Sequence, residues 1–160
     1  MRFEHLIEIN DPLNPLLDPL SRAQLWRGLV RRAEKPCEFV LGLDSAQIHE
    51  RIEDGTETEL TRTLDFGAFK VRDRVRLAPL SHTEIRTEAS DTYPASRLLI
   101  RIEEPAPEQL FLRFVYESDV ADGDGVLDAT TAALRNQAYQ SADLDTVARI
   151  RHLAEEGALG

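Results

Sequence analysis

The stretch LTRTLDFGAFKVRDRVRL, residues 60–77, is the most informative segment of the chain, because apolar and polar residues alternate on both sides of Gly67-Ala68. Alternation of this kind predicts two half-buried β-strands, and the break between them predicts a tight turn. Counted by twos, the apolar residues share one face of this hairpin. Arg62 and Asp73 fall on the same apolar face and are expected to be directly opposite neighbours.

The segments before this hairpin predict one strand and one helix. Residues 3–10 alternate well enough for a strand, and three prolines in residues 11–20 predict an irregular connection. Ser21 and Gln24 have the spacing of a capping box. The apolar stripe that follows, which includes Trp26, predicts a helix over residues 22–33.

From residue 45 onward the pattern predicts antiparallel strands followed by one long helix. Short turns separate about six alternating segments, so the sheet has about seven strands with the first one included. The long helix is expected from Val126 to about Glu156, with Asp124 as its N-terminal cap. Neither a repeat nor a low-complexity segment interrupts this order, so residues 1–160 are expected to form a single domain.

Composition and charge exclude several classes of function. The chain is 42% apolar and 30% charged, as in globular proteins, and its net charge of −10 disfavours nucleic acids. No apolar run is long enough for a membrane span, and the charged N-terminal segment does not read as a signal peptide. The single cysteine, Cys37, fits a reducing compartment, so we expect a cytoplasmic protein.

Three segments of the chain carry a resemblance to a known family: FEHLIEIND (3–11), LSRAQLWRGLVRRAEKP (20–36) and RNQAYQSADLDTVARIR (135–151). Together with the order of elements, they resemble the AtaL-like branch of the START and birch-pollen-allergen superfamily, also called SRPBCC or polyketide cyclase superfamily. The resemblance implies an α+β helix-grip fold, in which a curved antiparallel sheet wraps around a long C-terminal helix. It also implies an internal ligand cavity, without a catalytic signature or a cofactor.

One face of the long helix independently favours a cavity. The face is apolar at its ends and small or polar in its middle, which indicates space between helix and sheet rather than close packing. Its members are Val126, Leu127, Thr130, Ala133, Leu134, Gln137, Ala138, Ser141, Leu144 and Ala148. The opposite stripe, with Tyr139, Ile150 and Leu153, would then face solvent, which is typical of a partner surface such as that of a homodimer.

Arg62 and Asp73 would form a polar cluster on the concave wall of the sheet. Thr87 is expected near Asp73, and a three-residue turn in the preceding hairpin would place Glu50 beside Arg62. Three readings remain open: a polar anchor for a ligand, a purely structural buried pair, or a solvated cluster whose strand is flipped by a bulge.

Other residues that carry chemistry have weaker patterns. The four histidines lack metal-ligand spacing, so no metal site is expected. His5 lies on inward parity and is the best-placed general base, although a core role is the simpler interpretation. Trp26 is expected to pack in the core, and the alternative is that it forms the floor or the rim of the cavity.

The sequence therefore predicts a binder of one small, largely apolar molecule. The expected ligand-binding residues are Arg62, Asp73, Glu50, Phe66, Phe69, Thr87, Phe114, Tyr116, Leu134, Gln137 and Trp26. The alternative is a polyketide cyclase or dehydratase-like enzyme, with Arg62 stabilising an enolate and His5 or Asp73 as base. A third interpretation is a protein-interaction or co-chaperone-like module, which would have a filled core.

Overall fold

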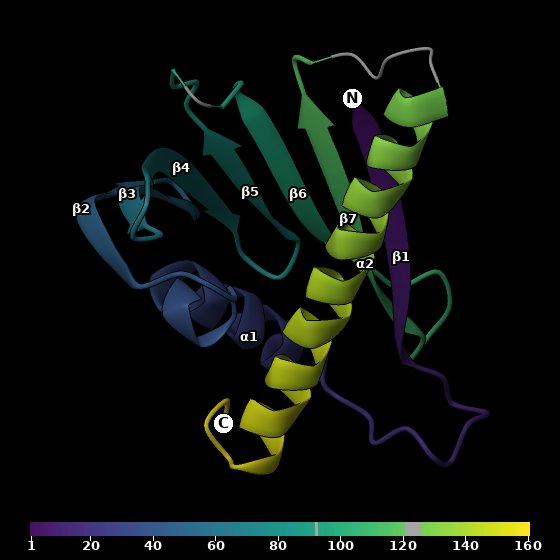
Figure 1. The fold of residues 1–160 in the computed structure, drawn as a ribbon. Coiled ribbons are helices and arrows are strands. Elements are labelled where there is room, and N and C mark those ends of the chain that lie inside the picture. The colour runs from purple at the N-terminus through teal and green to yellow at the C-terminus, as the bar shows by residue number, and fades with distance from the viewer. Residues whose placement is uncertain (92, 121–125) are drawn as a thin grey trace.

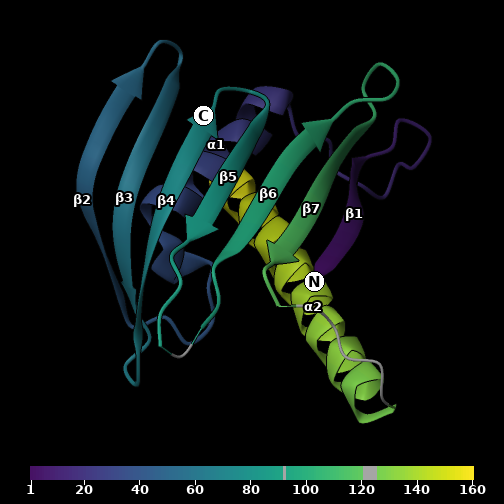
Figure 2. The same cartoon turned by 90° about the horizontal axis from the view of Figure 1, so that it is seen from above.

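The computed structural model describes residues 1–91, 93–120 and 126–160, and its strands form one curved antiparallel sheet (Figures 1 and 2). The strand order is β1-β7-β6-β5-β4-β3-β2. The strands are β1 (Arg2–Asn10), β2 (Ser45–Asp54), β3 (Glu57–Asp65), β4 (Lys70–Ala78), β5 (His82–Thr87), β6 (Ser96–Glu103) and β7 (Leu110–Ser118). The sheet and the long C-terminal helix confirm the predicted α+β helix-grip fold.

Two helices and one short 3-10 turn lie on the concave side of this sheet (Figure 2). They are α1 (Arg22–Glu34), η1 (Pro36–Glu38) and α2 (Val126–Glu155). The predicted capping box of α1 is confirmed: the Gln24 amide donates to Ser21 Oγ at 3.0 Å, and the Ser21 amide donates to Gln24 Oε1 at 2.9 Å. The expected cap of α2, Asp124, lies outside the described residues.

The β3–β4 hairpin has the register that the sequence predicts. Arg62 lies opposite Asp73, and the Phe66 amide donates to the Phe69 carbonyl at 2.9 Å across the Gly67-Ala68 turn. On the next strand, Thr87 lies opposite Asp73. The two-residue turn fixes this register, because a slip by one residue would move every apolar side chain of the hairpin to the other face.

Glu50 does not join this cluster, so its expected position is wrong. The β2–β3 turn has two residues rather than three, and the register shifts between Ile48 and Glu50. Before the shift Ile48 lies opposite Arg62; after it Glu50 lies opposite Thr61. This β-bulge reverses the inward parity of Glu50, and its side chain is exposed.

The apolar core fills one end of the concave face. The larger cluster joins α1 and the C-terminal half of α2 to β1, β6 and β7, and includes Leu25, Phe114 and Ile150. A smaller cluster packs the C-terminal half of α1 on β3, β4 and β5. Trp26 contacts both clusters. Both helices pack at this end, whereas the N-terminal half of α2 runs along β7 and β1, away from α1 (Figures 1 and 2).

The orientation of α2 is opposite to the one expected from its sequence. Leu134 is 63% exposed and Gln137 is exposed, whereas Thr146, Ile150 and Leu153 are buried. The large apolar residues of the last turns fix the rotation of the whole helix against α1 and β1, so the apolar residues of its first half turn outward. The stripe that contains Tyr139 is therefore an internal face, and the homodimer surface expected there is wrong.

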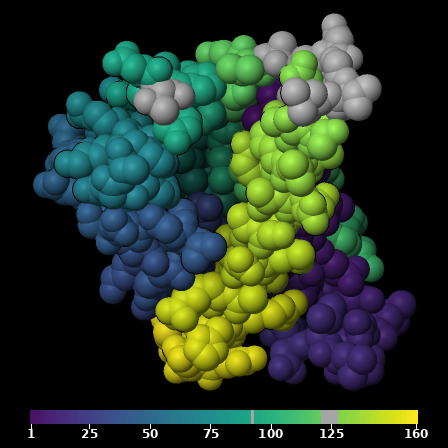
Figure 3. All heavy atoms as spheres, viewed as in Figure 1, coloured from purple at the N-terminus to yellow at the C-terminus, as the bar shows by residue number. Residues whose placement is uncertain are grey.

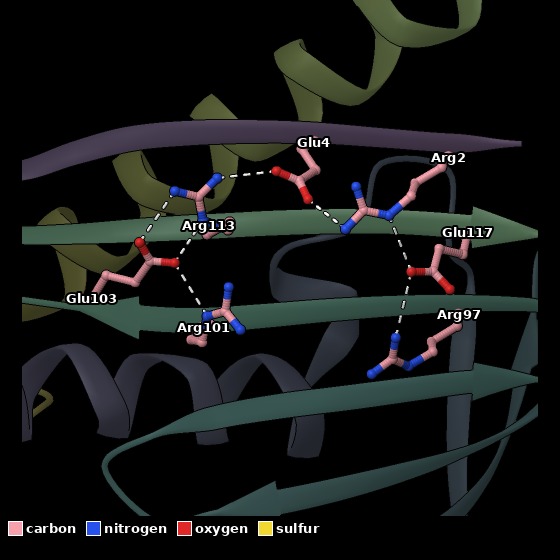
Figure 4. A network of polar contacts seen from close by, with 7 residues as sticks. All are labelled: Arg2, Glu4, Arg97, Arg101, Glu103, Arg113 and Glu117. Atoms are coloured by element: carbon pink, nitrogen blue, oxygen red, sulfur yellow. Dashed lines mark hydrogen bonds and ion pairs between the residues drawn. The ribbon is translucent and has the colours of Figure 1, made fainter.

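The convex face of the sheet carries interleaved ion pairs between β1, β6 and β7 (Figure 4). Its members are Arg2, Glu4, Arg97, Arg101, Glu103, Arg113 and Glu117. The Arg113–Glu103 pair joins β7 to β6, with Nε 2.6 Å from Oε2. Within the described ranges, no helix has the length and apolar character needed to span a membrane.

Candidate functional site

A cavity of about 570 Å³ lies between the N-terminal half of α2, the C-terminal end of α1 and strands β3 to β7. In the space-filling view the surface is hollowed between α2 and the blue-green segments facing it (Figure 3). Its walls are mostly aliphatic and aromatic, with a few polar groups. The apolar members are Met1, Pro36, Val40, Leu64, Phe66, Phe69, Val71, Ile85, Tyr93, Pro94, Leu98, Tyr116, Val120 and Tyr139.

The structure brings together six of the residues expected at a ligand site. These lining residues are Arg62, Phe66, Phe69, Asp73, Thr87 and Tyr116. Two others, Phe114 and Trp26, pack in the core and do not line the cavity. Phe114 points inward as expected, but it lies at the end of the sheet that α1 and α2 fill.

Glu50, Leu134 and Gln137 lie outside the cavity. Glu50 is turned away by the bulge in β2, and Leu134 and Gln137 are on the outer face of α2. These three placements correct the expected site, and both causes are geometric: a single extra residue in a strand, and the rotation of one helix.

The Arg62–Asp73 pair forms a buried part of the cavity wall. The side chains of Arg62 and Asp73 are 2% and 1% exposed. Arg62 Nε donates to Asp73 Oδ1 at 2.8 Å and Nη2 donates to Oδ2 at 2.6 Å, while Nη1 donates to the Ala33 carbonyl at 2.7 Å. The guanidinium therefore also caps the C-terminal end of α1, where positive charge is favourable. These bonds tie β3, β4 and α1 together.

Two aromatic clusters line the cavity. Phe66 stacks on Phe69 with ring centroids 5.0 Å apart, and Tyr93 lies 5.0 Å from Phe69 on the same side. Tyr116 stacks on Tyr139 of α2 with centroids 3.9 Å apart and planes at 8°. These flat, apolar walls suit a ring-containing molecule.

Behind the Tyr116 wall lies a chain of three polar groups. The Tyr116 hydroxyl donates to Asp143 Oδ1, and His5 Nδ1 lies 3.2 Å from the other oxygen, Oδ2. Burial raises the pKa of the Asp143 carboxyl, while the hydrogen bonds from Tyr116 and His5 lower it. Burial and the adjacent Asp143 also raise the pKa of the Tyr116 phenol, so it remains protonated near neutral pH. The chain links the cavity wall to the partly exposed His5.

Arg32 is a lining residue that the sequence reasoning missed. Its Nε is buried without a hydrogen-bond partner, whereas its neighbour Arg31 pairs with Glu38 on the other side of α1. A sequence signal existed: Arg32 follows Leu25 and Leu29 at helical spacing, which places a cation on the apolar stripe of α1. Tyr139 and Asp143 were also missed, because the orientation of α2 was misjudged.

The described residues offer no group of three or more histidine, cysteine or acidic side chains placed to hold a metal ion. What the arrangement offers instead is enclosure of an apolar molecule, cations on one wall and a phenol linked to a carboxylate. Such a cavity can orient a ligand through a small number of polar groups.

The comparison with family models identifies one match over most of the chain. The model described as acetylaranotin biosynthesis cluster protein L, AtaL, matches residues 7–157. In a search of curated proteins, no sequence matches this chain.

Solved structures share the fold at low sequence identity. The di-domain ARO/CYC StfQ from the steffimycin biosynthetic pathway is 13% identical with a TM-score of 0.64; the match covers 98% of this chain and 51% of StfQ, so this chain spans about half of StfQ. Ara h 8.0201 is 10% identical with a TM-score of 0.58, covering 95% of this chain and 98% of that one. The Zhui aromatase/cyclase from Streptomyces sp. R1128 is 15% identical with a TM-score of 0.54, covering 96% and 95%.

At these identities the solved structures establish the helix-grip fold alone. The family match is of a different kind, because it covers nearly the whole sequence, from β1 to the last turn of α2. The chain belongs to the AtaL family.

Proposed function

We propose that the protein binds one small, largely apolar organic molecule in the cavity between the sheet and α2. The observation that carries this proposal is the cavity itself, about 570 Å³ of space walled by aromatic and aliphatic side chains. A volume of this size suits a small organic ligand, and apolar walls with a few polar groups are the usual composition of such sites. A protein-interaction module with a filled core would not need this space.

The roles of the lining residues follow from their contacts. The Phe66–Phe69 stack and the Tyr116–Tyr139 stack would hold the flat part of the ligand. The Arg62–Asp73 pair supplies a fixed polar surface; because its bonds are made within the protein, we assign it to shaping the wall rather than to gripping the ligand. Thr87, opposite Asp73, adds a hydroxyl at the same wall.

The test uses N-phenyl-1-naphthylamine, a neutral probe that fluoresces in apolar surroundings. The protein is expected to bind it with a stoichiometry of one, and Val71→Trp is expected to abolish binding by filling the cavity from β4. Arg74→Trp is the matched control, because Arg74 lies on the same strand with the opposite parity and is exposed. Equal binding by the wild type and Val71→Trp would place the probe elsewhere and contradict the proposal.

A second candidate is an enzyme of the aromatase/cyclase kind, which the Tyr116–Asp143–His5 chain favours. The chain could move a proton to or from a bound carbonyl compound through the Tyr116 hydroxyl. Two solved structures of this fold, StfQ and Zhui, are named as aromatase/cyclases. Asp73 does not suit the role of base, since both of its oxygens accept from Arg62.

Turnover separates these two candidates. The protein is incubated with a short poly-β-carbonyl thioester, and the absorbance of the mixture is recorded over time to detect an aromatic product. An enzyme that uses the chain would form product, and Tyr116→Phe would stop turnover while still binding the neutral probe. If the wild type binds the thioester without converting it, the enzyme candidate is contradicted and the ligand-binding function remains.

We also propose a reducing, cytoplasmic location. Its support is the single cysteine, Cys37, which is exposed and free, as thiols are in a reducing compartment. Alkylation of intact cells with a membrane-permeant and an impermeant thiol reagent tests it, because a cytoplasmic Cys37 reacts with the permeant reagent only.

A further inference from the structure

We propose that Arg32 makes the cavity selective for ligands that carry an anionic group, such as a carboxylate, a phenolate or a sulfonate. This inference rests on the proposed ligand-binding function and deepens it by naming the chemical class of the ligand. The rest of the ligand would be the apolar, ring-containing part that the aromatic walls accommodate.

The first observation is that Arg32 has a charge without a protein partner. It lines the cavity from the last turn of α1, and no hydrogen bond or ion pair involves it within residues 1–91, 93–120 and 126–160. Its Nε is buried, and a buried donor without an acceptor costs free energy of folding. A bound anion would accept hydrogen bonds from this guanidinium in the geometry that arginine favours.

The second observation is that neighbouring arginines are paired. Arg31 donates two hydrogen bonds of 2.8 Å to Glu38, and Arg62 is held by Asp73 and the Ala33 carbonyl. The chain thus provides carboxylates for the cations beside Arg32 and leaves Arg32 directed at the cavity. This contrast distinguishes Arg32 from an ordinary surface arginine, which water would solvate.

The third observation is the charge of the lining. On the concave wall the cavity is lined by two arginines of α1 and β3, Arg32 and Arg62, against one carboxylate, Asp73, in a chain whose net charge is −10. Asp73 pairs with Arg62, so the charge of Arg32 is not balanced at this wall; Arg97 and Glu117 border the cavity but pair within the network on the convex face. Positive charge in a recess with apolar walls concentrates anions there.

The surroundings of Arg32 explain why this positive charge persists. Burial lowers the pKa of the guanidinium from its usual value, and the charges of Asp143 and Asp73 act in the opposite direction. Both carboxylates are already engaged, Asp143 by Tyr116 and His5, and Asp73 by Arg62. Their negative charges favour the protonated guanidinium without pairing with it, and arginine keeps its proton at any ordinary pH.

The experiment compares two probes with the same aromatic scaffold. 8-Anilinonaphthalene-1-sulfonate carries one sulfonate that N-phenyl-1-naphthylamine lacks, so the ratio of their dissociation constants isolates the anionic group. The wild type is expected to bind the sulfonate at least about tenfold more tightly, since a hydrogen bond to a charged group has this order of effect. Arg32→Gln is expected to lose most of that ratio while binding the neutral probe as before.

Three further variants make the result specific. Arg32→Lys is expected to keep part of the preference, and Arg74→Gln, which removes the same charge from the convex face, is expected to keep all of it. Arg32→Met is expected to raise the urea midpoint of the unliganded protein, because it removes a buried Nε donor that has no hydrogen-bond acceptor. A residue with a structural role would lower that midpoint.

Each outcome decides between the inference and the function on which it rests. If neither probe binds the folded wild type, both are overturned. If the neutral probe binds but the preference for the sulfonate is absent, or survives in Arg32→Gln, the anionic subsite is overturned and the apolar site stands. A fall in stability or a loss of folding in the Arg32 variants assigns Arg32 to structure and also overturns the subsite.

Discussion

Separating Arg62 from Asp73 is expected to destabilise the fold strongly, since both side chains are almost completely buried. In Asp73→Val, the guanidinium keeps only its bond to the Ala33 carbonyl and remains charged, because arginine does not release its proton. In Arg62→Met, a buried carboxylate loses both of its donors and the Ala33 carbonyl loses its cap. Breaking a buried ion pair from one side costs about 3–5 kcal/mol.

The double variant Arg62→Met/Asp73→Val should be far more stable than the sum of the single changes predicts. It contains no unpaired charge, and its main loss is the hydrogen bond to Ala33, worth about 1–3 kcal/mol for a buried acceptor left unsatisfied. The expected coupling between the two sites is therefore several kcal/mol, because contacting residues of one network are not additive.

Urea unfolding at neutral pH measures these values through the fluorescence of Trp26. It is the single tryptophan of the chain and contacts both core clusters, so it reports loss of the core. Single variants that each lose under about 1 kcal/mol, with additive effects in the double variant, would refute the reasoning, because solvated ion pairs behave in that way.

Two other predictions concern packing and pH. In Gly28→Ala the new Cβ would lie 2.7 Å from Ile150 Cγ2, and this overpacking is expected to cost about 1–3 kcal/mol, offset by roughly 1 kcal/mol because alanine has the higher helix propensity. Thermal unfolding should show a smaller loss of stability when the same change is made in an Ile150→Ala background, and an equal loss there would argue against this contact. The Arg113 guanidinium lowers the pKa of the Glu103 carboxyl, so the pair stabilises the fold above the ordinary glutamate pKa of about 4.3 and loses this contribution as the pH falls below it. Urea midpoints measured from pH 6 to pH 3 should therefore decline less in Glu103→Gln than in the wild type, and parallel curves would contradict the assignment.

The hairpin of residues 60–77 shows what the sequence determines locally. Strict alternation and a two-residue turn leave one register, so the pairing of Arg62 with Asp73 and the stacking of Phe66 on Phe69 follow from parity. The same reasoning fails for Glu50, because a bulge gives no signal in the alternation of an edge strand that is exposed along its whole length.

The rotation of α2 shows what the sequence leaves undetermined. Leu134 and Leu144 favour one face of the helix, and Ile150 and Leu153 favour another. Packing at the C-terminal end decides between them, and Leu134 is exposed as a result. Tyr139 consequently lines the cavity instead of the expected partner surface, and no local sequence pattern could have shown this.

Native mass spectrometry of the freshly purified protein, repeated after denaturation, tests the central claim most directly. The account predicts that the folded protein carries, in at least part of the population, one molecule of a few hundred daltons in order of size, released on denaturation and ionising more strongly in negative mode because of its anionic group. A folded protein of apo mass that also gains no mass when mixed with the naphthylamine or the sulfonate probe would contradict a ligand-binding cavity.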